Sequence, residues 1–409
     1  MGYDAVMKKS SWRTPVVVLI CGSSILLITF GVRQNYGLLM GPISSSLHWG
    51  REVFAFAIAV QSLVWGVTTP IAGFIADRYG PARVAAIGSA CYALGLFLMS
   101  QASTSMDATI SIGVLTGFAA SMAGFPVVLS VIGRSVGPER RSLWLGIASA
   151  AGSSGQVVLV PLGQAFINEY GWITALMGLA ALTALTIPLA AALVGGNKAA
   201  PDQTARQSAG EAFREARRHS GFQLLSIGYF VCGFQTMFIG AHLPAYLTDL
   251  GFSPSLGATA LACIGGANII GCILWGQLGA KWPKKNLLCV LYFLRAVDMA
   301  IFMLTPITEI SVILFASTMG LMWLGTVPLT TGLVAQIFGT QFMATLVGIT
   351  FVSHQIGSFL GIWLGGVFYD MYGNYDAIFW GGVVVGVLAS FIHYPINDKP
   401  MARLAVARA

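Results

Sequence analysis

Two ionisable side chains lie inside long apolar stretches, where a charge needs a partner. Arg33 lies within an apolar run that begins at residue 15, and His354 lies about nine residues into the run 345–368. A lone charge near the centre of a bilayer costs roughly 2.5–3.5 kcal/mol on insertion scales, so we expect Arg33 to face protein or water. Its planar guanidinium group matches a carboxylate. Arg33 therefore either contacts a bound anion or forms a fixed ion pair between helices.

His354 would lie near the middle of a membrane-spanning helix, because each helical residue adds about 1.5 Å of rise. Histidine changes its charge close to neutral pH. When protonated it could bind an anion, and when neutral it could release that anion, which is the linkage that proton-coupled transport requires. A neutral histidine that is hydrogen-bonded between two helices is the alternative.

A second group of charges consists of Arg295 and Asp298, which lie three residues apart and can meet on one helix face. We expect a buried ion pair that stabilises its half of the molecule, and a pair that faces a central cavity is the alternative. Aromatic residues on spans more often pack or face lipid. Other polar or aromatic residues that could line a cavity are Gln61, Trp65, His242 and Trp323.

These side chains must be positioned by membrane-spanning helices, because the chain is too apolar for a soluble core. Of its 409 residues, 56% are hydrophobic and 9% are charged. A spanning helix needs roughly 20 mostly apolar residues. We therefore predict an all-α membrane protein with twelve transmembrane helices, at residues 15–40, 53–75, 82–101, 108–132, 143–166, 173–195, 221–247, 255–279, 287–305, 308–334, 345–368 and 376–395.

Basic residues gather on every second connection between these spans. With the N-terminus inside, 19 of the 22 Lys and Arg residues are cytoplasmic, Arg51 alone lies in an outer loop, and Arg33 and Arg295 lie within spans. The positive-inside rule then predicts that both termini are cytoplasmic. We expect a multi-pass protein of the cell membrane, in a bacterial inner membrane. The net charge of +7 follows from this topology, so we expect no nucleic-acid partner. The first apolar run is too long for a secretion signal, and we expect it to be retained.

The two halves of the sequence are related to each other. A shift of 202 residues places Gly146, Gly155, Gly163 and Gly171 on Gly348, Gly357, Gly365 and Gly373. We predict two pseudo-symmetric six-helix bundles, at residues 1–194 and 221–409, joined by a cytoplasmic linker at residues 195–220. Such a parallel repeat is typical of transporters whose substrate site lies near the bilayer midplane, between the halves.

The connection between the second and third spans carries a recognisable motif, formed by Gly73, Asp77, Arg78, Gly80 and Arg83. It resembles the G-x-x-x-D-R-x-G-x-(R/K) signature of the major facilitator superfamily. The resemblance implies a gating role, a latch that stabilises the outward-open state. Gly73 would permit close helix approach and Asp77 would bond across the domain interface. A tight loop with cytoplasmic charge is the alternative.

Two further segments, residues 30–52 and 353–376, are similar to bacterial relatives of the monocarboxylate transporters and of the oxalate:formate antiporters. The resemblance implies that Arg33 stands at about the depth of a functional lysine, and that His354 replaces a lysine that helps to hold a dicarboxylate. Those families carry an arginine where this sequence has Cys272, one turn after Asn268, so the main carboxylate anchor is missing. Either Arg33 and His354 take over its role, or the substrate is not a simple monocarboxylate.

We therefore expect a secondary active transporter of small organic anions, mono- or dicarboxylates, that works by alternating access with proton coupling or exchange. A drug or metabolite efflux antiporter is the alternative, and we expect neither an enzyme, a metal site nor a cofactor. The expected partners are the anion and the lipid bilayer, and the expected state is a monomer. His354 is also the expected proton-coupling residue, and the expected substrate-binding residues are Arg33, Tyr36, Gln61, Asn268, His354 and Gln355.

Overall fold

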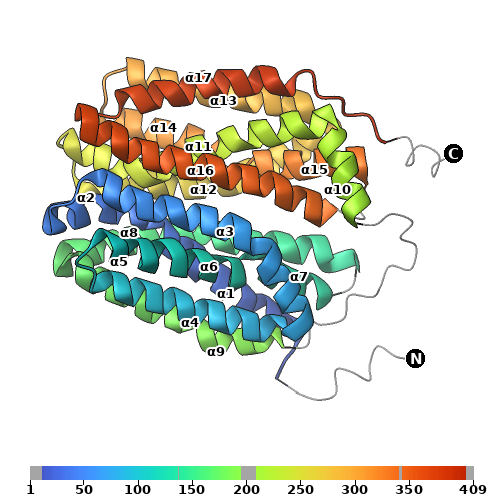
Figure 1. Cartoon of the computed structure of the whole chain (residues 1–409), viewed down its shortest axis with the longest axis horizontal. Helices are drawn as coiled ribbons and strands as arrows, with labels where there is room; N and C mark the ends of the chain where they lie inside the picture. Colours follow the sequence, from blue (N-terminus) through green and yellow to red (C-terminus); the bar gives the residue numbers. More distant parts are fainter. Residues whose placement is uncertain (1–11, 137, 195–208, 340–342, 402–409) are drawn as a thin grey trace.

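The computed structural model describes residues 12–136, 138–194, 209–339 and 343–401, and within these ranges the regular structure is helical. Figure 1 shows the arrangement of the helices. In chain order they are α1 (Pro15–Gln34), α2 (Tyr36–Leu47), α3 (Arg51–Tyr79), α4 (Pro81–Ser100), α5 (Ser105–Ala108), the π-helical η2 (Thr109–Leu115), α6 (Thr116–Met122), α7 (Phe125–Arg134), α8 (Pro138–Ala184), α9 (Thr186–Leu189), the 3₁₀ turn η3 (Ala190–Leu193), α10 (Ala209–Arg218), α11 (Ser220–Asp249), α12 (Pro254–Lys281), α13 (Lys284–Leu304), α14 (Glu309–Met322), α15 (Thr326–Phe338), α16 (Met343–Tyr372) and α17 (Asp376–His393).

The helices of the described ranges make twelve passes through a membrane-sized layer. Eleven segments are long and apolar enough to span a bilayer, and one of them, Trp144–Leu193, has 50 residues. That segment turns back at Gly171, whose φ of 77° lies in the left-handed region that glycine adopts without strain. Gly373, its partner in the sequence repeat, has a φ of 71° at the turn before α17. The predicted all-α fold with twelve spanning helices is confirmed.

The internal repeat recurs as the same helix crossing in both halves. A Cβ atom on Gly155 of α8 would lie 2.0 Å from the Leu27 carbonyl oxygen of α1. In the other half, a Cβ on Gly357 of α16 would lie 1.9 Å from the Phe230 carbonyl oxygen of α11. Glycine at these two positions lets the backbones touch, which is how small residues join helices in a membrane.

The two halves lie side by side, with α1–α9 in one and α10–α17 in the other (Figure 1). We call the end that carries Trp12 and Met401 the terminal end, and the opposite end the distal end. The halves meet where α3 packs on α16 and where α8 packs on α12, as in the bond from Gln156 Nε2 to the Leu261 carbonyl (2.8 Å). The predicted domain boundaries stay a prediction, because residues 195–208 lie outside the described ranges.

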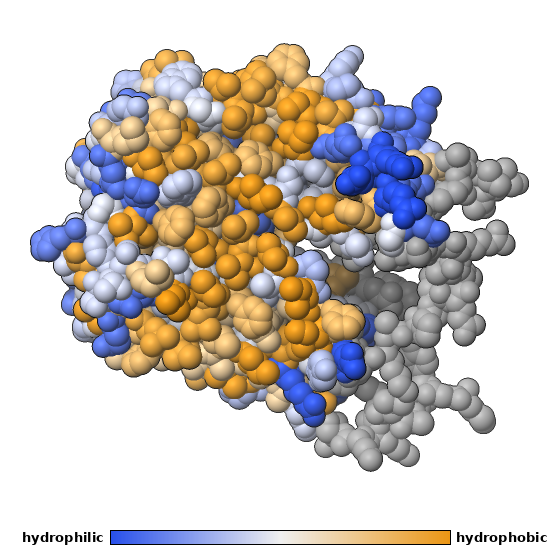
Figure 2. All heavy atoms as spheres, in the orientation of Figure 1, coloured by the Kyte–Doolittle hydropathy of each residue, from blue (hydrophilic) through white to orange (hydrophobic). Residues whose placement is uncertain are grey.

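The outer surface of the bundle matches a lipid environment. Figure 2 shows apolar side chains over the flank, and more polar ones toward the two ends. Large apolar side chains such as Phe74, Ile310 and Phe391 are more than 60% exposed, which in a protein of this size indicates contact with lipid tails. Figure 2 also shows the surface hollowed between the two halves at the terminal end.

Candidate functional site

Arg33 is buried at the interface between the two halves, with 8% of its surface exposed. Its Nε donates to Gln61 Oε1 (3.2 Å) and its Nη2 to Ser62 Oγ (3.0 Å), both on α3. Nη1 points to the sulfur of Met237 on α11 (3.3 Å), and the guanidinium lies 5.0 Å from the centre of the Trp65 ring. No acidic side chain of the described residues forms an ion pair with Arg33. A fixed ion pair, the alternative in the sequence analysis, is thus not formed there.

A chain of hydrogen bonds joins Arg33 to His354 across the interface. Gln355 Nε2 donates to the Ser62 carbonyl (3.0 Å), while Gln355 Oε1 lies 3.0 Å from His354 Nδ1. Ser62 is itself the residue that accepts from Arg33. The imidazole is 6% exposed and stacks on Phe351, with ring centres 5.8 Å apart. Ser62 and Gln355 therefore connect Arg33 of one half to His354 of the other.

Tyr36 and Gln61 extend the same network into the first half. Gln61 Nε2 donates to Thr116 Oγ1 (2.7 Å) and to the Tyr36 hydroxyl (3.3 Å). The Tyr36 hydroxyl lies 3.4 Å from that of Tyr92. Since Gln61 Oε1 accepts from Arg33, these side chains fix the orientation of the guanidinium. Five of the six expected substrate-binding residues thus form one connected group, namely Arg33, Tyr36, Gln61, His354 and Gln355.

Asn268 lies apart from this group. Its Nδ2 is 3.4 Å from Ser153 Oγ, and its Oδ1 accepts from the Leu324 N–H (3.0 Å) and faces the Cys272 thiol (3.4 Å). These contacts are to α8 and to the segment between α14 and α15. No hydrogen bond within the described residues connects Asn268 to Arg33 or His354.

A small cavity lies beside Arg33, between α2, α3, α11 and α16. It measures about 20 Å³, which is room for roughly one water molecule. Two buried donors, Gln34 Nε2 and Trp323 Nε1, have no hydrogen-bond partner among the described residues. Gln34 Oε1 and Trp323 Cζ2 lie 3.9 and 3.8 Å from the place where a Cβ would stand on Gly240, which lines the cavity. Free donors around a buried cation favour a ligand rich in acceptors, such as a carboxylate.

The predicted pair of Arg295 and Asp298 is wrong. Arg295 is fully buried, and its Nε donates to the Met322 carbonyl (3.1 Å) while its Nη2 donates to the carbonyls of Met322 and Trp323. Asp298 instead accepts from Thr318 Oγ1 (2.7 Å) on α14. The break between α14 and α15 frees backbone carbonyls, and these take the guanidinium that the helix spacing alone would assign to the carboxylate.

The D-R-x-G motif lies at the terminal end, where α3 meets α4. Gly80 has a φ of 102°, which a turn between two helices needs and glycine supplies. Arg78 and Arg83 are exposed, and the side chain of Asp77 lies outside the described part of the structure. The close helix approach expected at Gly73 is not made in this conformation, because a Cβ there would meet nothing within 4 Å.

At the distal end, Arg51 joins the two halves. Its Nη1 and Nη2 each lie 2.5 Å from a carboxylate oxygen of Asp249 at the end of α11. The guanidinium stacks on the Tyr369 ring at 3.8 Å and donates to the Tyr375 hydroxyl at 2.8 Å. Asp370 of α16 accepts from the Arg51 N–H (3.0 Å) and so caps α3 from the other half. We call Arg51, Asp249, Tyr369, Asp370 and Tyr375 the distal clasp.

The distal clasp is connected to the cavity wall through His242. His242 Nε2 lies 2.8 Å from the Ile362 carbonyl, so it carries the proton, and Nδ1 then accepts from the Tyr375 hydroxyl at 3.2 Å. Burial raises the pKa of Tyr375 more than the neighbouring Arg51 lowers it, so the hydroxyl stays neutral and can donate. Ile362 lines the small cavity. The hydrogen bonds thus run in one direction, from Arg51 to the wall of the site.

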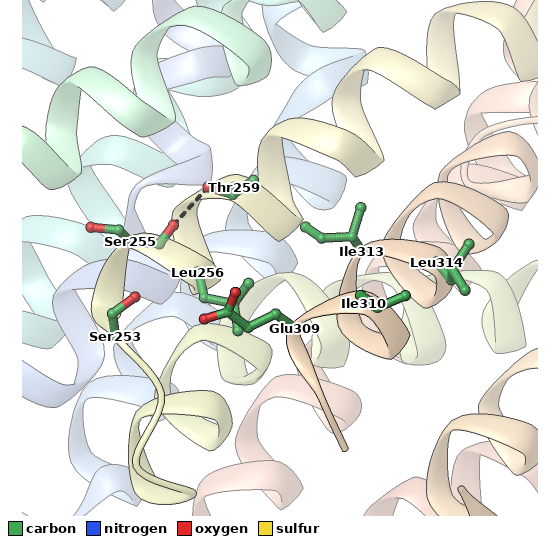
Figure 3. A pocket seen from close by; sticks show the side chains of 8 residues that line it. All are labelled: Ser253, Ser255, Leu256, Thr259, Glu309, Ile310, Ile313 and Leu314. Carbon is green, nitrogen blue, oxygen red and sulfur yellow. Dashed lines mark hydrogen bonds between the residues drawn. The ribbon is translucent and has the colours of Figure 1, made fainter. Parts of the chain in front are cut away.

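A second hollow lies elsewhere, between the starts of α12 and α14 (Figure 3). It measures about 520 Å³, and its lining includes Ser255, Thr259 and Glu309. Ile310 and Leu314, which also line it, are 74% and 61% exposed. This hollow opens on the lipid-facing flank of one half, and its lining contains no cationic side chain.

Comparison with known proteins identifies the family. The sequence profile of the Major Facilitator Superfamily matches residues 22–362. The chain belongs to the Major Facilitator Superfamily. Members of this family are membrane transporters and not enzymes. The predicted fold, family and general transport function are therefore confirmed, together with a multi-pass location in a membrane.

Individual relatives of this facilitator chain are distant but cover almost all of it. An uncharacterised MFS-type transporter, YcxA of Bacillus subtilis, is 27% identical over 93% of this chain and 96% of its own length. Monocarboxylate transporter 13 of Bos taurus is 26% identical over 98% of this chain and 95% of its own length. A bacterial homologue of the human lysosomal transporter Spinster, solved in an inward-facing and occupied conformation, superposes with a TM-score of 0.74. Its sequence identity is 15%, over 96% of this chain and 100% of that chain, and it shows the fold alone.

The sequence analysis assigned no role to the residues of the distal clasp or to Gln34, and it named Trp323 only as a residue that could line a cavity. Arg51 had a signal, because it is the one basic residue expected in an outer loop. Gln34 and Trp323 had weaker signals, since an unpaired donor is visible only once its neighbours are placed. Within the described ranges, no group of three or more His, Cys, Asp or Glu side chains could hold a metal ion.

Proposed function

We propose that this chain is a secondary active transporter of small organic anions, mono- or dicarboxylates, driven by protons or by exchange. The observation that carries the proposal is Arg33, a buried guanidinium between the halves that pairs with no described carboxylate. Three of its five N–H groups make the contacts given above, one of them to a weakly accepting sulfur. The unpaired donors of Gln34 and Trp323 lie near the same cavity. The relatives that are named monocarboxylate transporters support the same substrate class.

Alternating access follows from the size of the cavity and from where the halves are joined. Space for one water molecule cannot admit a carboxylate, so the halves must part to load the site. With the distal clasp closed, the substrate would enter or leave at the terminal end. Reversal requires Arg51 to separate from Asp249, and the D-R-x-G motif at residues 73–83 would then hold the terminal end closed.

In this proposal, His354 is the residue that couples transport to protons. A protonated imidazole opposite Arg33 would add a second positive charge for the anion, and its deprotonation would weaken the binding. Gln355 Oε1 accepts from His354 Nδ1 while Gln355 Nε2 donates to the Ser62 carbonyl, so this side chain connects the ring to the interface bond at Ser62. Affinity should therefore rise as the pH falls.

The remaining parts of the proposal concern location and assembly. The distribution of basic residues supports cytoplasmic termini, so the terminal end would lie inside the cell. The bacterial relatives YcxA and YhjX support a bacterial inner membrane. We further propose that the protein acts as a monomer, because each chain contains both halves of the site.

A thermal-shift screen of the purified protein tests the substrate class. Mono-, di- and tricarboxylates would be compared at pH 5.5 and 7.5 with sugars, nucleosides and lipophilic cations, because a ligand that binds only the folded state raises its melting temperature. We expect at least one carboxylate to raise the melting temperature of the wild type and to have little effect on Arg33→Gln. If only lipophilic cations stabilised the protein, the efflux alternative would replace this proposal.

A further inference from the structure

The tenth span is broken in the middle, and side chains from two other helices bond to the break. The span consists of α14 and α15, separated by residues 323–325. In an unbroken helix the Leu324 N–H would donate to the Gly320 carbonyl. Here the Trp323 N–H takes that carbonyl (3.0 Å), and the Leu324 N–H donates to Asn268 Oδ1 (3.0 Å). A side-chain amide of α12 thus replaces a backbone partner of the span.

The carbonyls that the break leaves free are also bound by side chains. Trp275 of α12 donates from Nε1 to the Leu321 carbonyl (3.0 Å). Arg295 of α13 donates to the carbonyls of Met322 and Trp323. Non-helical backbone inside a membrane is tolerated only where its polar groups find such partners. The negative end of the α14 dipole also suits a guanidinium that no described acidic side chain neutralises.

Glycine residues bring α12 into close contact with the break. A Cβ on Gly271 would lie 2.0 Å from the Leu321 carbonyl oxygen, and a Cβ on Gly325 would lie 2.3 Å from the Trp275 ring. Both glycines bring α12 against the broken segment. The Trp323 side chain is 1% exposed, its Nε1 has no partner among the described residues, and its Cζ2 lies 3.8 Å from the place where a Cβ would stand on Gly240, which lines the cavity.

We propose that Arg295, Asn268 and Trp275 are positioning residues. By binding the backbone groups at residues 321–324 they keep α14 and α15 from joining into one helix, and they thereby fix the position of the Trp323 indole next to the substrate cavity. Arg295 acts through the backbone of Trp323 and does not itself touch the substrate. The Cys272 thiol donates to the same Asn268 Oδ1 (3.4 Å) that accepts from the Leu324 N–H, so both bonds hold the amide oxygen at the break. The effect on binding rests on the proposed carboxylate transport, whereas the effect on the break does not.

Hydrogen–deuterium exchange of the purified protein tests the structural part without any ligand. Arg295→Met keeps an apolar stem of similar length but removes every donor, so peptides covering residues 319–328 should exchange at least tenfold faster than in the wild type. Asp298→Asn is the matched control, because Asp298 lies one turn along α13 and its carboxylate accepts from Thr318 of α14 and not from the break. Unchanged exchange in Arg295→Met, or an equal increase in Asp298→Asn, would overturn the proposal.

Fluorine NMR adds a signature that a general loss of stability would not give. In protein labelled with 5-fluorotryptophan, the Trp323 resonance is assigned by its loss in Trp323→Phe. Arg295→Met should shift this resonance and leave that of Trp380, a partly exposed residue of α17, in place. If Arg295→Met does not fold, Asn268→Ala removes the acceptor of the Leu324 N–H and should speed exchange of the same peptides. An unshifted Trp323 resonance and unchanged exchange in Asn268→Ala would each contradict the assignment.

Binding of oxalate and of L-lactate to the same variants separates this proposal from the proposed function. Where one of these acids binds the wild type, Arg295→Met and Trp323→Phe should weaken it to a similar extent, and the double variant should be no weaker than either alone, because the two residues act as one unit. Fully additive losses would show that Arg295 does not act through Trp323. If neither acid binds the wild type, the carboxylate proposal is put in doubt, while the exchange and fluorine experiments still decide the role of Arg295.

Discussion

The distal clasp should control how often the protein opens at its distal end. Asp249→Asn removes the charge that Arg51 binds but keeps the size of the side chain and one acceptor oxygen. Hydrogen bonds to a charged group contribute about 1.5–3 kcal/mol, whereas exposed ion pairs contribute about 0–1 kcal/mol. The two side chains here are 11% and 28% exposed, so we take about 1.5 kcal/mol. That energy corresponds to roughly a tenfold rise in the population that is open at this end.

Cysteine labelling from outside the cell measures this population. In a cysteine-free background, Ile58→Cys places a thiol on α3 in the cavity wall, where it is buried while the clasp is closed. A membrane-impermeant maleimide should then label intact cells roughly tenfold faster in Asp249→Asn than in the parent. The rate is the useful quantity, because it follows the fraction of time that the thiol is reachable.

Asp107→Asn is the control for this experiment. Asp107 lies at the same end of the molecule, but its carboxylate bonds, within the described residues, to Ser103 and Thr104 of its own helix start. Its loss should leave the labelling rate unchanged. The reasoning would be refuted by equal labelling of the parent and of Asp249→Asn, or by an increase of the same size in Asp107→Asn.

Three further predictions concern the site and the helix crossings. Arg33→Gln should weaken carboxylate binding about 10- to 150-fold, measured by calorimetry, because a charge-assisted bond of about 1.5–3 kcal/mol is lost. The affinity of the wild type should rise as the pH falls from 7.5 to 5.5, and His354→Gln should flatten this dependence, because glutamine keeps a hydrogen bond without titrating. Gly357→Ala should lower the melting temperature through a clash costing about 1–3 kcal/mol, whereas Gly348→Ala, whose Cβ would meet nothing within 4 Å, should not.

The fold was predictable because its determinants are local or repeated. Apolar runs of spanning length identify helices without knowledge of their neighbours. The repeat paired Gly171 with Gly373, and the structure gives both a positive φ at a turn between spans. What the pattern missed was the break at residues 323–325, because the apolar run continues through it without a change in composition.

The site was predictable in part, for a related reason. An ionisable residue in an apolar run is visible in the sequence alone, so Arg33 and His354 could be named as candidates. Their hydrogen-bond partners could not be predicted, because these depend on which helices pack together. Arg295 shows the limit: the spacing to Asp298 is real, yet the carbonyls freed by a distant break compete better for the guanidinium. The distal clasp could likewise not be predicted, because the partners of Arg51 lie on α11 and α16, about 200 and 320 residues further along the chain.

The bond between Gln355 and Ser62 would connect substrate binding at the proposed site to the closure of the interface. Ser62 accepts from Arg33 through its hydroxyl and from Gln355 through its carbonyl, so the two halves hold the guanidinium and the imidazole in place when the cavity is nearly empty. An anion between Arg33 and His354 would offer acceptors to both and would replace some of these contacts. Binding of the anion would then change the free energy of the interface little, because each hydrogen bond broken between the halves is replaced by one to the anion. A carrier that must move both with and without its substrate needs such a balance.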